Sequence, residues 1–140
     1  MMNKKIILLL SFTFIASCSA NVQYTKNRKD SVIQQKKYFS GQILKGRSSY
    51  YADKFHGKKT ANGETFDMHK LTAAHRYLPF GTILNVINLA NNKSVRVRVN
   101  DRGPFVGDRI LDLSYGAAKK IGMISTGVAD VKVKIIRLGE

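Results

Sequence analysis

The stretch Ser94-Val95-Arg96-Val97-Arg98-Val99-Asn100 (residues 94–100) alternates valines with polar residues, and this alternation decides the fold class. A period of two residues is typical of a β-strand with one buried face, so the valines are expected in the core and both arginines in solvent. The apolar stretch 82–88 comes before it, and the intervening segment 89–93 is rich in turn residues. The two stretches therefore predict a β-hairpin.

Short apolar segments of the same kind occur on both sides of this hairpin. They predict further strands at residues 48–51, 72–75, 110–113 and 128–138. Ser114 is suited to cap a helix over residues 115–121, and Gly122 to end that helix in the left-handed conformation. Six short strands and one short helix within residues 46–140 favour a closed barrel, because closure leaves no strand edge unpaired.

The first eighteen residues have the pattern of a bacterial lipoprotein leader. Two lysines precede an apolar run over residues 6–15, and small residues come directly before Cys18. The run is too short to span a membrane and is typical of a signal peptide. Because Ile15-Ala16-Ser17-Cys18 resembles a lipobox, we expect removal of residues 1–17 and lipidation of Cys18 with diacylglycerol and an N-acyl chain. An ordinary secretory leader with an incidental cysteine is the alternative.

Residues 18–45 are polar and basic and have no regular apolar period, so they predict a lipidated, flexible tether. The folded domain is then expected over residues 46–140, which end two residues after the last predicted strand. Ser19 follows the lipidated cysteine, where aspartate would be the familiar inner-membrane retention signal. We therefore expect anchoring to the cell membrane, at the periplasmic face of the outer membrane if the cell has two.

The formal net charge of +15 indicates a polyanionic partner. Nucleic acid, anionic lipid and anionic cell-wall polymer all fit this charge, but export argues against nucleic acid. The single cysteine excludes an internal disulfide. His56, His69 and His75 lack metal-ligand spacing, and the chain has no Gly-x-Ser-x-Gly elbow. We therefore expect no metal site and no other cofactor. We also do not expect a serine hydrolase.

Three blocks of sequence occur in order and carry a family resemblance. They are Thr60-Ala61-Asn62-Gly63-Glu64-Thr65-Phe66-Asp67, Leu71-Thr72-Ala73-Ala74-His75-Arg76-Tyr77-Leu78-Pro79-Phe80-Gly81-Thr82 and Val99-Asn100-Asp101-Arg102-Gly103-Pro104-Phe105. With these blocks, residues 46–138 resemble the rare lipoprotein A family, the septal-ring lytic transglycosylases. The resemblance implies a six-stranded double-psi β-barrel, the fold also found in expansins. It also implies cleavage of the bond between N-acetylmuramic acid and N-acetylglucosamine in peptidoglycan, preferably in strands lacking stem peptides. Such cleavage leaves 1,6-anhydro ends during wall remodelling or daughter-cell separation.

By motif, the resemblance implies three catalytic residues, Asp101, Glu64 and His75. Glycoside cleavage needs an acid to protonate the leaving oxygen and an anion to stabilise the sugar cation. Asp101 is the preferred acid and base because the resemblance in fold favours it most clearly. It also lies at the end of a valine-rich strand, so a rigid element orients it. Glu64 would be the second carboxylate or exchange roles with Asp101, and His75 would orient a carboxylate or shuttle the proton. Candidates for binding substrate are Asp112, Tyr51, Arg102, Asn62 and Asn100.

Each candidate also has a structural interpretation. A glutamate beside Asn-Gly is usually a solvated turn residue, and an aspartate before arginine is usually a turn or ion-pair residue. Asp112 could organise the helix start, His75 could be a hydrogen-bonded, half-buried histidine, and Arg102 could hold Asp101. Tyr50 and Tyr51 are adjacent on a strand, so one is expected in the core and the other against a sugar.

The sequence leaves two other functions open. A non-catalytic, expansin-like lipoprotein would grip or loosen the wall through the same barrel. A scaffold would instead recruit cell-division proteins through its basic surface. Soluble domain incubated with bare glycan discriminates them, since only an enzyme releases anhydro-ended fragments.

Overall fold

The computed structural model describes residues 37–51 and 53–140. The predicted signal peptide, the lipidated Cys18 and the predicted tether up to residue 36 lie outside the described residues. The elements are β1 (Ile43–Tyr50), η1 (Asp53–Phe55), β2 (Thr72–Ala74), β3 (Ile83–Asn88), β4 (Ser94–Asp101), β5 (Arg109–Leu113), α2 (Tyr115–Lys120) and β6 (Val128–Arg137). Within the described residues, no helix is long and apolar enough to cross a membrane.

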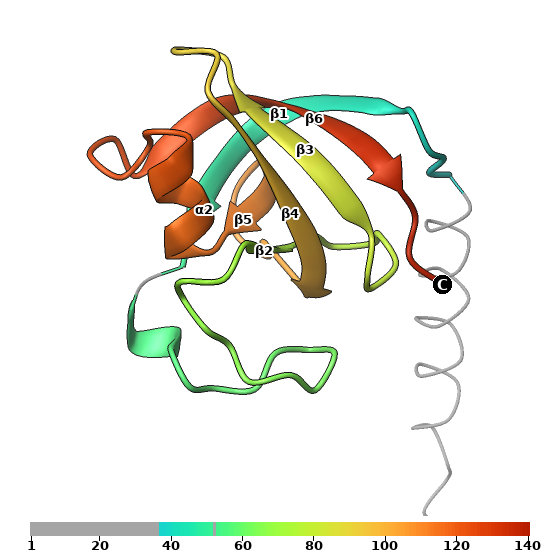
Figure 1. Ribbon diagram of the computed structural model, residues 1–140, viewed down its shortest axis with the longest axis vertical. Coiled ribbons are helices and arrows are strands. Elements are labelled where there is room, and N and C mark those ends of the chain that lie inside the picture. Colours follow the sequence, from blue (N-terminus) through green and yellow to red (C-terminus); the bar gives the residue numbers. More distant parts are fainter. Residues whose placement is uncertain (1–36, 52) are drawn as a thin grey trace, which may run out of the picture.

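The six strands close into a barrel in the order β1-β5-β2-β4-β3-β6 (Figure 1). The pairs β1/β5 and β2/β4 are parallel, and the other pairs are antiparallel. The predicted hairpin is the antiparallel pair β3/β4. The expectation of a mainly β, six-stranded closed barrel with one short helix is therefore confirmed.

Alternating residues of the strands fill the barrel. On β4, the three valines at 95, 97 and 99 are buried, as their period-two spacing predicted. The core cluster and the residues packed against it all lie between Tyr38 and Leu138. Because all six strands and the core that they enclose lie within this range, this part of the chain forms a complete folding unit.

The first strand begins earlier than the sequence predicted. β1 starts at Ile43 rather than Ser48, so residues 43–45 belong to the barrel and not to the tether. The reason is tertiary: Leu44 packs against the core, and residues 43–49 pair continuously with β6. Ile43 and Leu44 form an isolated apolar pair between polar residues, which does not give the alternating pattern of a strand.

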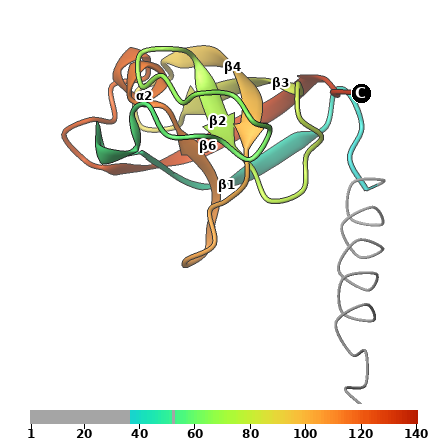
Figure 2. The ribbon, with the colours of Figure 1, turned by 90° about the horizontal axis from the view of Figure 1, so that it is seen from below.

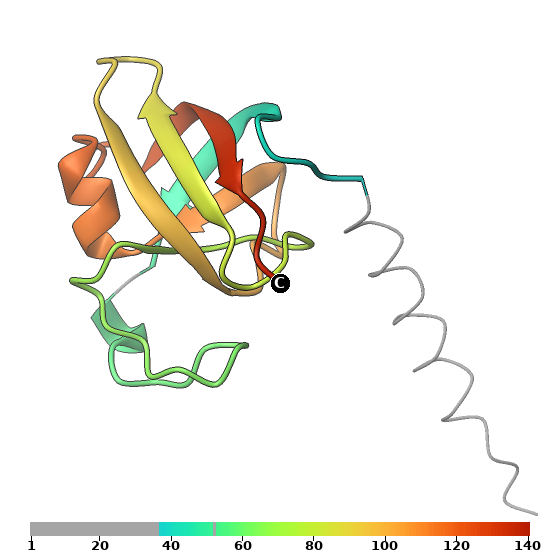
Figure 3. The same cartoon turned by 45° about the vertical axis from the view of Figure 1, so that its right-hand side comes forward.

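Helix α2 closes one end of the barrel (Figure 3). Ser114 caps α2, its hydroxyl accepting from the Ala117 N–H at 3.3 Å, and Ala117 and Ala118 are buried. Gly122 has φ 67°, so the predicted left-handed residue after the helix is confirmed. α2 ends at Lys120, one residue earlier than expected.

Two loops extend from the barrel. Residues 53–71 cross beneath the ends of β2 and β4 (Figure 1), and residues 102–108 project away from the barrel between β4 and β5 (Figure 2). The first loop contacts the helix closely, because a Cβ at Gly116 would lie 2.4 Å from the His69 carbonyl oxygen. This packing fixes the loop that carries Glu64 against the barrel.

Candidate active site

Three neighbouring strands, β5, β2 and β4, place two aspartates on either side of Ala74. Ala74 is the register partner of Asp101 on β4 and of Asp112 on β5. Register partners point to the same face of a sheet, and neighbouring strands lie about 4.8 Å apart, so the two aspartate Cα atoms are roughly 10 Å apart. Ala73 points the other way into the core. Both carboxylates therefore belong to one outer face of the barrel wall.

The chain after Asp101 folds back over this row at Gly103. Its φ of 132° is one that residues with side chains rarely adopt. A methyl group at this position would lie 3.9 Å from the Ala74 Cβ and 3.9 Å from Asp112 Oδ2. Glycine thus allows the backbone to pass between the two acids without filling the space beside them.

Asp101 is held by three donors. Its Oδ1 accepts hydrogen bonds from the backbone N–H groups of Ala61 and Arg102, both at 2.8 Å. Its Oδ2 accepts from the Tyr51 hydroxyl at 2.8 Å. Burial, followed by the hydrogen bond to Asp101, raises the pKa of Tyr51 well above its ordinary value, so the phenol stays protonated and donating. The carboxylate is therefore fixed, and Oδ2 is its less occupied oxygen.

An open cavity of about 570 Å³ lies against Tyr51, the side-chain donor to Asp101. Its volume is within the size range of ligand sites. It is lined by Tyr50, Tyr51, Asp53, Met68, Tyr115 and Gly127. As the sequence predicted, the two adjacent tyrosines divide their tasks: Tyr50 packs against the core and Tyr51 faces the candidate site. Tyr50 also borders the cavity, so aromatic surface is available on two sides of it.

Glu64 lies beside Asp101 as an ion-paired carboxylate. Arg98 donates to both of its oxygens, at 2.7 and 2.8 Å. This pair lowers the pKa of Glu64 to about 2, with further help from hydrogen bonds to Asn62 and Asn100. Glu64 is therefore ionised at neutral pH, which suits the anion that stabilises a sugar cation. The alternative in which Glu64 exchanges roles with Asp101 as proton donor does not fit this environment.

The environment of the Arg98 side chain differs from the one predicted. Arg98 was expected to face solvent, but its side chain is only 37% exposed because it turns to Glu64. Strand alternation predicts which way a side chain points. It does not predict a partner in a loop 34 positions away.

The two asparagines hold Glu64. Asn62 and Asn100 donate side-chain N–H bonds to its carboxylate at 2.9 and 3.2 Å. Asn62 Oδ1 also accepts from the Thr60 hydroxyl, and the Asn62 N–H donates to the Asn100 carbonyl oxygen. These contacts place both carboxamides beside Glu64, where they orient the loop, rather than pointing freely toward a substrate.

His75 has its backbone at the site and its ring turned away. Its N–H donates to the Asp101 carbonyl oxygen at 3.2 Å, but its Nδ1 accepts from the Tyr77 and Leu78 N–H groups at 3.1 and 3.0 Å. Burial lowers the pKa of His75 to about 4, so the imidazole is neutral with its proton on Nε2. The ring stands edge-on to Tyr38 beside a cavity of about 130 Å³. Because Nδ1 is occupied, the contacts support a positioning role better than proton shuttling.

Arg102 supports the same turn. Its guanidinium donates to the carbonyl oxygens of His75 and Leu78 at 3.3 and 3.0 Å and stacks 3.7 Å over the Phe80 ring. Only its backbone N–H reaches the Asp101 carboxylate. The side chain thus holds residues 75–80 together through Nη1, and contact of the guanidinium with a substrate stays a prediction.

Asp112 lies deeper than Asp101. Ser49 donates a 2.5 Å hydrogen bond to its Oδ1, and the Arg109 Nε lies 3.6 Å from the same oxygen. The helix start is capped by Ser114 rather than by Asp112. Asp112 therefore faces the candidate site, although at 9% exposure it is less open to a substrate than its partner across Ala74.

Sequence reasoning missed three participants, Arg98, Ser49 and Arg109. Arg98 carries a usable signal, because it lies on the strand that ends at Asp101. Ser49 meets Asp112 only through the pairing of β1 with β5, whereas Arg109 lies three residues before Asp112 on β5 itself. Among residues 37–51 and 53–140, no three His, Cys, Asp or Glu side chains gather as they would around a metal ion.

Comparison with known proteins adds sequence relatives to this geometry. A family model described as lytic transglycolase matches residues 43–133. The endolytic peptidoglycan transglycosylase RlpA of Campylobacter jejuni is 57% identical over 99 residues, which are 71% of this chain and 36% of that protein. The protein of the same name from Pseudomonas aeruginosa is 58% identical over 89 residues, 64% of this chain and 26% of its own. The chain thus spans less than half the length of these curated relatives.

Solved structures agree on the fold. A Streptomyces papain inhibitor has a TM-score of 0.59 at 25% identity and covers 70% of this chain and 97% of its own. The apo expansin of Clavibacter michiganensis has a TM-score of 0.58 at 19% identity and covers 71% and 52%. At this identity, the similarity to the expansin shows a shared barrel fold and no shared function.

Proposed function

Because this chain belongs to the lytic transglycolase family of double-psi β-barrels, we propose that it cleaves the glycan strands of peptidoglycan between N-acetylmuramic acid and N-acetylglucosamine. The reaction is an internal transfer that leaves a 1,6-anhydro end on the muramic acid residue. Glycan without stem peptides is the proposed substrate, and wall remodelling or daughter-cell separation the proposed setting.

One observation carries this proposal: a single loop binds Asp101 through the Ala61 N–H and holds the ionised Glu64 against Arg98 of the same strand. Tyr51, which donates to Asp101, lines an aromatic cavity. The loop residues Ala61 and Asn62 bond to Asp101 and to the Asn100 carbonyl, so the same loop positions both acids. Glycoside cleavage needs two carboxyl groups in different protonation states. The arginine clamp on Glu64 fixes one of these two states, the ionised one.

In the proposed reaction the protonated Asp101 donates from Oδ2 to the glycosidic oxygen as the bond from that oxygen to C1 breaks. Positive charge develops on the ring of the muramic acid residue, and the ionised Glu64 stabilises it. The 6-hydroxyl of the same sugar then attacks C1, and its proton passes to the Asp101 carboxylate, which restores the acid. No water enters the products. Tyr51 keeps Oδ2 oriented throughout.

The test uses residues 19–140 and glycan freed of stem peptides. Mass spectrometry should find 1,6-anhydro fragments with the wild type and a loss of at least about a hundredfold with Asp101→Asn, which removes the proton donor. Glu64→Gln should also lose activity. Asp130→Asn is the matched control, since this exposed carboxylate lies on β6, away from the site.

The same experiment separates cleavage from wall binding. A non-catalytic, expansin-like protein would retain glycan in a pull-down and release no fragments with any variant. Anhydro fragments that persist in Asp101→Asn would instead assign the chemistry to another residue.

The proposal extends to location. The lipobox-like sequence supports cleavage before Cys18 and its lipidation, and Ser19 favours the periplasmic face of the outer membrane where a cell has two membranes. Labelling with a fatty-acid analogue should mark the wild type and not Cys18→Ser. Cell-division proteins are possible further partners, and a pull-down unaffected by Asp101→Asn would identify them.

A further inference from the structure

We propose that the outer face of β1 and β6 docks on the anionic surface of a phospholipid membrane and turns the Asp101 site away from it. We call this surface the basic face, and its members are Lys45, Lys132, Lys134, Ile43 and Ile136. The barrel order β1-β5-β2-β4-β3-β6 puts β6, with β1 and β3 on its two sides, across from β2, the central strand of the candidate site.

The strand register concentrates positive charge on this face. Lys45 on β1 is the direct partner of Lys132 on β6, and Lys134 follows two residues later on the same outward side. Like charges directly opposite on neighbouring strands destabilise a sheet, so this pair is not explained by barrel stability. An anionic surface would remove the repulsion.

No acid within the described residues neutralises the basic face. None of the ion pairs found there includes any of its three lysines. The acid on the same side of β6 is Asp130, and it faces Arg47 on β1. Arg47 pairs in addition with Asp108 at 3.7 Å. The remaining positive charge is therefore available to a partner.

Apolar side chains stand among these charges. Ile43 is 54% exposed and is the register partner of Lys134, and Ile136 follows two residues along the same strand. Phe39, 63% exposed, comes just before β1. Cationic residues around exposed apolar ones are typical of surfaces that bind anionic lipid and insert shallowly. A soluble polyanion would gain nothing from the isoleucines, which favours a membrane as the occupant.

The chain enters the barrel at this face. The Gly41 N–H donates to the Ile135 carbonyl oxygen at 2.7 Å, so the segment before β1 lies next to Ile136. Cys18 precedes Lys37 by 19 residues, a length that spans at most roughly 65 Å when fully extended. Lipidation of Cys18, proposed above, would keep the barrel close to the membrane, and docking does not depend on catalysis. Docking would leave Asp101 facing the wall.

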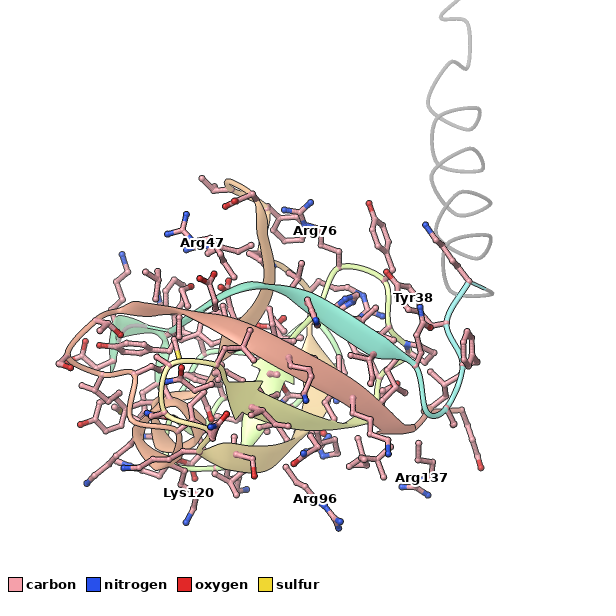
Figure 4. The ribbon with its side chains drawn as sticks, turned by 90° about the horizontal axis from the view of Figure 1, so that it is seen from above. Tyr38, Arg47, Arg76, Arg96, Lys120 and Arg137 are labelled. Atoms are coloured by element: carbon pink, nitrogen blue, oxygen red, sulfur yellow. The ribbon has the colours of Figure 1, made fainter. Side chains whose placement is uncertain are left out.

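Figure 4 looks onto β1 and β6. The test variant is Lys45→Gln/Lys132→Gln/Lys134→Gln. The matched control, Lys93→Gln/Lys119→Gln/Lys120→Gln, removes the same charge from exposed positions elsewhere. Lys120 lies at the other end of the barrel from Arg137 (Figure 4).

Cosedimentation of residues 19–140 with vesicles of phosphatidylglycerol and phosphatidylethanolamine measures docking without the lipid anchor. Each lysine near an anionic surface contributes about fivefold, so the test variant should bind about a hundredfold more weakly. The control should lose less than fivefold. Ile43→Ser should also weaken binding, and phosphatidylcholine vesicles should bind poorly.

Wild-type binding by the test variant, equal losses in test and control variants, or equal binding to phosphatidylcholine would each overturn the proposal. A loss of retention on bare glycan without any loss on vesicles would also overturn it, in favour of the wall polymer. Asp101→Asn should keep vesicle binding while losing glycan cleavage, and the lysine variant should cleave normally. Failure of docking is therefore distinguishable from failure of the proposed function.

Discussion

Replacing either partner of the Glu64–Arg98 pair should remove a pH-dependent part of the barrel's stability. The clamp lowers the pKa of Glu64 from 4.5 to about 2, which would correspond to about 3 kcal/mol for an unscreened carboxylate. The Glu64 side chain is 41% exposed, so solvent screening reduces the contribution to about 1 kcal/mol. Glu64→Gln should lower the free energy of unfolding at pH 7 by about this amount.

The sign of the pH dependence follows from the direction of the shift. Because the pKa in the folded state lies below its unfolded value, the stabilisation is fully present above pH 4.5 and is lost as the pH falls to about 2. Wild type and Glu64→Gln should therefore differ at pH 7 and converge near pH 2.

A double-mutant cycle isolates the interaction. Urea unfolding followed by circular dichroism gives the free energies of the wild type, Glu64→Gln, Arg98→Gln and the double variant. The coupling should be about 1 kcal/mol at pH 7 and should have mostly vanished by pH 2.5. Coupling near zero at pH 7, or coupling that does not change with pH, would refute the ionised clamp and, with it, the assignment of Glu64 as the fixed anion.

Three further predictions test the neighbourhood of this pair. Tyr51→Phe removes the donor to Asp101 Oδ2 and should lower kcat about ten- to a hundredfold with little change in KM, whereas Tyr50→Phe should leave kcat intact; equal effects would contradict the role of Tyr51. The His75 ring nitrogens, followed by NMR, should titrate near pH 4, so the stability from its neutral form is present above pH 6.5 and lost as the pH falls through 4; a midpoint near 6.5 would show that the ring is not buried as described. Gly116→Ala places a Cβ 2.4 Å from a carbonyl oxygen of the preceding loop and should cost about 1–3 kcal/mol in a thermal melt, and an unchanged Tm would mean that this contact is loose.

The local pattern of the sequence was sufficient for most of the fold. Alternation of valine with polar residues predicted β4 and its buried face, and the Ser114 cap and Gly122 predicted both ends of α2. These signals are local, since each depends on neighbours within one strand or one helical turn. The start of β1 escaped because its pairing with β6 involves residues about 90 positions away.

The sequence also determined which acids to consider, because the blocks that carry Glu64 and Asp101 are recognisable along the chain. What only the tertiary structure decided is how the side chains divide the work. Barrel closure sets Asp101 and Asp112 on either side of Ala74, turns Arg98 onto Glu64, and gives His75 Nδ1 to two backbone N–H groups. Protonation states and hydrogen-bond partners depend on groups that folding brings together from distant segments. The strand pairing that brings these segments together cannot be predicted from the sequence of any single segment.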